Sequence, residues 1–116
     1  MTIDEVRQFI MSPHAKKEIP AMMDAQDYAR GAAQYIGELV NQFEEQLSVE
    51  EQTALDRVIT DESMTETIRK TYIKAQTAPT KKNLADLKLM YHRLIQTEKM
   101  LAQAIKTRRE EPRGGI

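Results

Sequence analysis

The stretch Pro20–Leu47, PAMMDAQDYARGAAQYIGELVNQFEEQL, decides the fold, because no proline follows Pro20 until Pro79 and apolar residues recur at helical spacing. Proline fits the first turn of a helix, where its missing N–H is not needed. One helix over this stretch would be roughly 42 Å long. Its apolar residues step by three and four, which predicts a stripe that packs against other helices.

Small residues recur at every fourth position of this stretch, at Ala21, Ala25, Ala29, Ala33 and Gly37. A row of small side chains allows another helix to approach the backbone closely, so we expect close helix packing along it. Gly31 and Gly37 each cost about 1 kcal/mol of helix propensity relative to alanine. We favour close packing as the compensation, and a kink or a partner's contact is the alternative.

A second long helix is predicted over 81–109, after the break at 77–80 that contains Pro79. Leucine recurs along it at intervals of seven, at Leu87, Leu94 and Leu101, as in the seam of a helical bundle. Its expected length of roughly 43 Å nearly equals that of the first helix, which favours antiparallel pairing of the two.

Glu98 falls on this seam between Leu94 and Leu101. A carboxylate buried there would need a cationic partner or would have a raised pKa, and such a group can mark a functional site. We favour instead a rotation of the stripe, so that Thr97 faces inward.

Shorter helices are predicted at 3–11, 13–19, 49–59 and 64–76. Their start signals are capping boxes at Thr2–Glu5, Ser48–Glu51 and Ser63–Glu66, and the pair Ser12–Pro13. In a capping box, two side chains bond backbone N–H groups that a helix start leaves free. The sequence therefore predicts an all-α fold, an antiparallel helical bundle built on the two long helices. We expect a single domain over 1–111 and a flexible C-terminal tail over 112–116.

The composition is that of a folded helical protein, with 41% hydrophobic and 30% charged residues, which excludes the disordered class. The absence of cysteine excludes disulfides, thiol nucleophiles and cysteine-ligated metals. The N-terminal residues lack the apolar segment of a secretion signal, and no stretch approaches the roughly 18 apolar residues of a membrane span. We therefore expect a cytoplasmic protein.

Residue types that usually carry catalysis are few. Each serine stands at a predicted helix start, where its hydroxyl serves as a cap. The two histidines, His14 and His92, lie outside the spacing of known helical metal sites. Adjacent glutamates point about 100° apart on a helix and do not converge on a substrate. We therefore predict no catalytic residue, no cofactor and no metal site.

Charge is divided unevenly, with 8 basic and 14 acidic residues in 1–79 but 9 basic and 4 acidic residues in 80–116. We favour the interpretation that the basic last helix lies against acidic neighbours of its own chain. A basic arm for nucleic acid or for an acidic partner is the alternative. A pI of about 6.1 and an aromatic content of 5% argue against nucleic acid.

Elimination thus favours a non-enzymatic protein–protein interaction module, an adaptor, inhibitor or chaperone-like protein that presents helix faces to another protein or to a second copy of itself. Candidate partner-binding residues of the last helix are Leu89 and Met100, which lie outside the seam, with Arg93, Lys99 and Lys106. The alternative is a nucleic-acid-associated factor that uses the basic C-terminal helix. No membrane or small-molecule substrate is expected.

Overall fold

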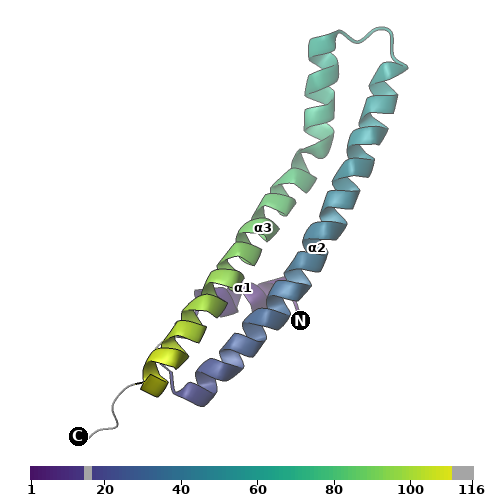
Figure 1. Cartoon of the computed structure of the whole chain (residues 1–116). Coiled ribbons are helices and arrows are strands. Elements are labelled where there is room, and N and C mark those ends of the chain that lie inside the picture. The colour runs from purple at the N-terminus through teal and green to yellow at the C-terminus, as the bar shows by residue number, and fades with distance from the viewer. Residues whose placement is uncertain (15–16, 111–116) are drawn as a thin grey trace, which may run out of the picture. The chain divides into compact units, whose positions relative to one another are not determined.

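The computed structural model describes residues 1–14 and 17–110, and these residues form three α-helices without any strand. Helix α1 spans Ile3–Met11, α2 spans Ile19–Ile59 and α3 spans Glu66–Glu110. The two long helices, α2 and α3, pack against each other (Figure 1). The all-α prediction is therefore confirmed, and the predicted tail over 112–116 lies outside the described residues.

The chain divides into two compact units, which are residues 1–37 with 89–116, and residues 38–88. We call the first the three-helix unit, because it contains α1, and the second the two-helix unit. In the three-helix unit Arg30 of α2 pairs with Glu98 of α3, and in the two-helix unit Glu44 pairs with Lys88. Residues that come later in α2 thus meet earlier residues of α3, as the predicted antiparallel pairing requires.

Helix α1 begins with the capping box that the sequence predicts. The hydroxyl of Thr2 accepts a hydrogen bond from the Glu5 N–H at 3.2 Å, and the Glu5 carboxylate accepts one from the Thr2 N–H at 3.4 Å. After the helix ends, the chain folds back so that His14 Nε2 donates to the Phe9 carbonyl at 2.7 Å. The imidazole also stacks on the Phe9 ring, with centroids 4.3 Å apart.

The helix predicted at 13–19 is wrong for the described part of that range, which is not helical before Ile19. Residues 15 and 16 lie outside the described residues. The buried His14 bonds backward to α1 instead of starting a new helix. A serine–proline start signal is local, and here a side-chain contact with the preceding helix outweighs it.

The predicted separation of helices 20–47 and 49–59 is also wrong, because α2 continues unbroken through Ser48 to Ile59. Ser48 lies exposed within the helix. Strong helix formers precede it, and Ala54 and Val58 continue the buried stripe beyond it. Packing of this stripe against α3 outweighs the local capping signal.

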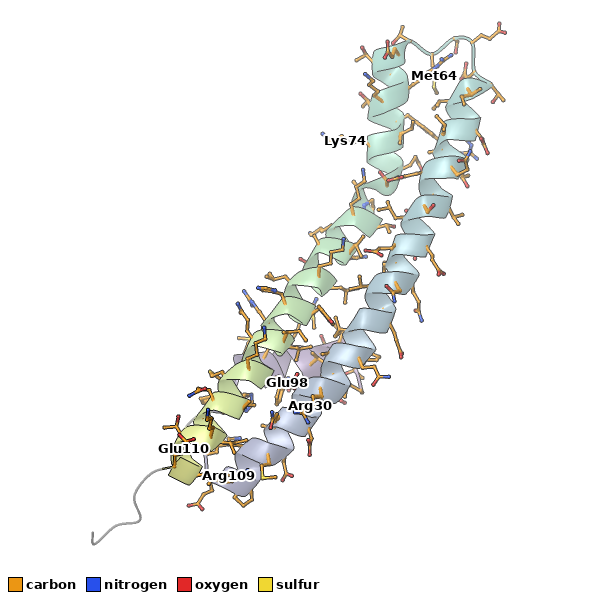
Figure 2. The ribbon with its side chains drawn as sticks, in the orientation of Figure 1. Arg30, Met64, Lys74, Glu98, Arg109 and Glu110 are labelled. Carbon is orange, nitrogen blue, oxygen red and sulfur yellow. The ribbon has the colours of Figure 1, made fainter. Side chains whose placement is uncertain are left out.

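The predicted break at 77–80 is wrong as well, because α3 continues through Pro79. Thr77 and Thr80 are buried at the positions that extend the leucine seam toward the start of the helix. The Thr77 hydroxyl donates to the Ile73 carbonyl at 2.9 Å, a bond that tends to bend helices. Helix α3 bends in this segment, after Lys74 (Figure 2). The exposed Pro79 is accommodated at the bend.

The start of α3 is likewise later than the predicted Met64. The Thr65 hydroxyl accepts a hydrogen bond from the Ile68 N–H at 3.3 Å and so caps the helix. Ser63, which the capping box pattern named as the cap, instead donates its N–H to the Asp61 carboxylate at 3.0 Å. The Asp61 carboxylate therefore stabilises the connection between α2 and α3 through its hydrogen bond with Ser63.

The hydrophobic core is unequally divided between the two units. Among its described residues, the three-helix unit buries eleven apolar side chains, Val6, Met22, Ala25, Ala29, Ala32, Ala33, Ile36, Met90, Leu94, Leu101 and Ile105. The two-helix unit buries four, Ala54, Val58, Leu84 and Leu87. Helix α1 makes the difference, because it adds a third layer in which Phe9 packs on Tyr28 with centroids 4.5 Å apart.

Replacing Ala29 with leucine should lower the free energy of unfolding by about 1–3 kcal/mol, because Ala29 is fully buried and the core has no room for three more carbons. Ala21→Leu is the matched control, since Ala21 belongs to the same row but is exposed. Urea denaturation checks both variants. Equal stabilities for Ala29→Leu and the wild type would contradict a closely packed row.

Replacing Pro79 with alanine should raise the free energy of unfolding by about 2 kcal/mol. The change restores a backbone N–H donor within α3, and the gain is partly offset by the greater entropy of the unfolded chain. Thermal and urea unfolding measure the difference. A less stable variant would mean that the bend at Pro79 is needed to bury Thr77 and Thr80.

Candidate functional site

The five candidate partner-binding residues all lie on α3 in the three-helix unit, and all five are exposed. Two of them, Arg93 and Met100, line a surface hollow of about 490 Å³ together with Ile10 and Met11 from the end of α1. The sequence predicts that Met100 lies outside the seam but does not show which part of α1 comes beside it.

The other candidates are not part of that hollow. Lys106 lines a different one, of about 370 Å³, with Gln26 of α2 and Arg109 of α3. Leu89, half-exposed, and Lys99 line neither hollow. The two hollows thus separate Arg93 and Met100 from Lys106.

Along the small-residue row of α2, Ala25, Ala29 and Ala33 are buried, whereas Ala21 is exposed. A Cβ atom at Gly37 would lie 3.4 Å from the Tyr91 ring, which is an ordinary van der Waals distance, so the ring packs on this glycine without requiring a glycine there.

The close-packing interpretation is wrong for the other glycine of α2, Gly31. No atom lies within 4 Å of where its Cβ would be. Helix packing therefore does not compensate for the low helix propensity of this residue.

Glu98 is neither fully buried nor turned away from α2. Its carboxylate accepts a hydrogen bond from Arg30 Nε at 2.6 Å, and the side chain keeps 26% of its exposure. The two side chains point toward one another between the helices (Figure 2). The hydrogen bond and the charge of Glu98 raise the pKa of Arg30. Thr97 is also half-buried, so the predicted rotation of the apolar stripe from Glu98 toward Thr97 is only partial.

A second polar contact joins the helices in the two-helix unit. Glu50 Oε1 accepts hydrogen bonds from the Thr80 hydroxyl at 2.8 Å and from Gln46 Nε2 at 2.9 Å. These bonds, that of Thr80 foremost, lower the pKa of the Glu50 carboxyl. Its other oxygen is buried and has no hydrogen-bond partner among the described residues. We call Glu50, Thr80 and Gln46 the polar clasp.

The predicted helix start at Ser48–Glu51 and the predicted break at 77–80 place Glu50 and Thr80 at helix ends, so the polar clasp is not among the predictions. One available signal was register, since Glu50 follows Phe43 by seven residues and precedes Ala54 by four. That spacing places Glu50 on the apolar stripe of a helix that runs through Ser48.

Beside the polar clasp lies a shallow hollow of about 260 Å³ between α2 and α3. Its walls include Val49, Thr53 and Arg57 from α2 and Tyr72 and Gln76 from α3. We call these five residues the open flank. Arg57 donates to the Tyr72 hydroxyl at 3.1 Å, and Glu50 of the polar clasp also lines the hollow.

Charged residues gather elsewhere on the two-helix unit. Lys88 and Glu44 form an ion pair at 3.3 Å. Glu51 lies seven residues after Glu44, and Lys81 lies seven residues before Lys88, so each shares a helix face with a member of the ion pair. We call these four residues the charged flank. The exposed Leu55 lies on this side of α2, one helical turn after Glu51.

Within the described residues, no three His, Asp or Glu side chains lie close enough together to hold a metal ion. Nor is any helix there long and apolar enough to cross a membrane. Comparison of the chain with protein-family models, with curated proteins and with solved structures finds no match.

Replacing Glu50 with glutamine should reduce the loss of stability in acid. A carboxyl group whose pKa is lower in the folded than in the unfolded state stabilises the fold at pH values above its ordinary pKa, here 4.5. That stabilisation disappears as the pH falls through the lowered pKa of the folded state. Urea unfolding between about pH 7 and about pH 3 measures the effect. Asp61, whose pKa is lowered by its hydrogen bonds to Ser63, makes the same contribution to acid sensitivity in the wild type and in the variant. Equal acid sensitivity of the two proteins would therefore contradict the polar clasp.

Proposed function

We propose that this protein is a non-enzymatic protein–protein interaction module that binds its partner through exposed helix faces, chiefly the open flank. The observation that carries the proposal is the small core of the two-helix unit, which buries four apolar side chains in residues 38–88. In the same unit, Val49, Leu55, Ile59 and Ile68 remain 41–65% exposed.

Two packed helices bury one stripe of each helix and leave the sides of their contact open. Small folded units usually need further packing, a metal or oligomerisation to become stable. In the three-helix unit this further packing comes from α1, whose Val6 is completely buried and whose Phe9 packs on Tyr28 of α2. In the two-helix unit, no described segment takes the corresponding role.

An approaching helix would find both apolar and hydrogen-bonding groups on the open flank. Val49 is 65% exposed, and fully burying a side chain of this size is worth about 1.5–3 kcal/mol. Thr53, Gln76 and the Tyr72 hydroxyl supply polar groups without net charge. A bound helix could cover Val49 with an apolar side chain and hydrogen-bond the polar groups around it.

A comparison of bait proteins tests the proposal. Val49→Glu places a charge on the open flank, whereas Leu55→Glu places the same charge about 120° away on the same helix. Both residues are exposed, so neither change should affect folding, which circular dichroism verifies. We expect wild-type and Leu55→Glu baits to capture a specific protein from an extract of the source cells, and the Val49→Glu bait to lose it.

If the three baits capture the same proteins in equal amounts, the open flank is not the binding surface. If none captures a specific protein and the chain also fails to associate with itself, the proposed function is wrong.

A further inference from the structure

We propose that α1 is an exchangeable helix, which leaves the α2–α3 pair of its own chain and docks on the same surface of a second copy, whose α1 docks on the first copy in return. The contact lies in the three-helix unit and involves no residue of the open flank, so it goes beyond the proposed function. Two observations carry the inference. Helix α1 is held on α2 and α3 by apolar contacts, and the turn that follows it buries a polar atom without a partner.

The surface under α1 is formed by α2 and α3 of the three-helix unit. Val6 is fully buried, and Phe9 packs against an apolar cluster and on the ring of Tyr28. We call Tyr28 and the four buried residues of this cluster the docking surface; the four are Met22, Ala25, Leu101 and Ile105. A second copy offers α1 the identical surface, so exchange preserves the packing of α1.

No hydrogen bond or ion pair in the described part of the chain joins α1 to α2 or α3. The polar contacts of α1 are internal to the helix and its ends, and they are Thr2–Glu5, Asp4–Arg7 and Gln8–Ser12. The two long helices of the same unit, by contrast, are joined by the ion pair of Arg30 and Glu98. When α1 leaves, its polar contacts go with it, and only apolar contacts have to form again on the second copy.

The turn after α1 supplies a reason for exchange. His14 is only 4% exposed, and its Nδ1 is buried without a hydrogen-bond partner among the described residues. Such an atom has lost the hydrogen bonds that water would make. Opening the turn returns His14 to water, and the Phe9 carbonyl then keeps the Ser12 N–H as a donor at 3.2 Å. A connection that carries a cost of this kind favours exchange of the segment that it joins.

The length of the connection sets the expected balance between the closed chain and the exchanged pair. Seven residues separate Met11 from Ile19, and they span at most about 25 Å. A connection this short keeps α1 near its own docking surface at an effective concentration on the order of millimolar. We therefore expect closed monomers to predominate at micromolar concentration and exchanged pairs to increase as the protein is concentrated.

Crosslinking between two single-cysteine variants of the full chain tests the inference, because the chain has no cysteine of its own. Met11 of α1 and Met100 of α3 are exposed and line the same hollow. Met11→Cys and Met100→Cys are mixed and treated with a short bismaleimide, and mass spectrometry identifies the products. We expect a covalent pair that joins the two chains and increases with concentration. Met11→Cys mixed with Ser48→Cys, an exposed position in the two-helix unit, is the matched control and should give little product.

Val6→Glu distinguishes docking of α1 from chance encounters. On the Met11→Cys chain it should reduce crosslinking about tenfold or more, because α1 would have to bury a carboxylate. On the Met100→Cys chain it should instead accelerate crosslinking, because the docking surface no longer holds its own α1. Gln8→Glu is the control and should have neither effect, since Gln8 is an exposed residue of the same helix.

Three results would overturn the inference. The first is crosslinking no greater than in the Ser48→Cys mixture, and the second is crosslinking that Val6→Glu on the Met11→Cys chain leaves unchanged. The third is a loss of crosslinking with Val6→Glu on either chain, because α1 would then be needed to form the docking surface. Val49→Glu should leave the crosslinking unchanged, so exchange of α1 and binding through the open flank can each fail while the other stands.

Discussion

The contact between α2 and α3 is the interaction on which the rest of the structure depends. Leu84 and Leu87 extend the leucine seam into the two-helix unit, and Leu94 and Leu101 carry it in the three-helix unit. A continuous stripe gains packing at every turn, whereas a capping signal or a proline affects one turn. The helices therefore run through Ser48 and Pro79, where local signals favour an end.

The two units use the same helix pair with different consequences. In the three-helix unit, α1 lies on the pair, and His14 closes the end of α1 through its bond to Phe9. In the two-helix unit the pair has no such cover, and its seam includes Thr77, Thr80 and Glu50. The unit with the smaller and more polar core is thus also the one with an uncovered flank, which is why we place the interaction there.

The polar clasp shows how a seam can tolerate polar side chains. Thr80 and Gln46 both donate to one oxygen of Glu50, and Thr77 donates to a carbonyl of its own helix. Each hydroxyl is thereby satisfied, which limits the cost of burial. Polar residues at seam positions can also restrict how helices pair, because a shifted register would leave them buried without partners.

The sequence by itself determined the all-α class, the capping box that starts α1, the leucine seam and the pairing of two long helices, because these follow from periodic apolar spacing and local hydrogen bonds. Only the tertiary structure decided the true helix lengths, the role of His14, the polar clasp and the separation of open and charged flanks. These features depend on which side chains from distant parts of the chain meet. Packing between helices set them, and it acts over many turns, whereas a capping residue or a proline acts over one.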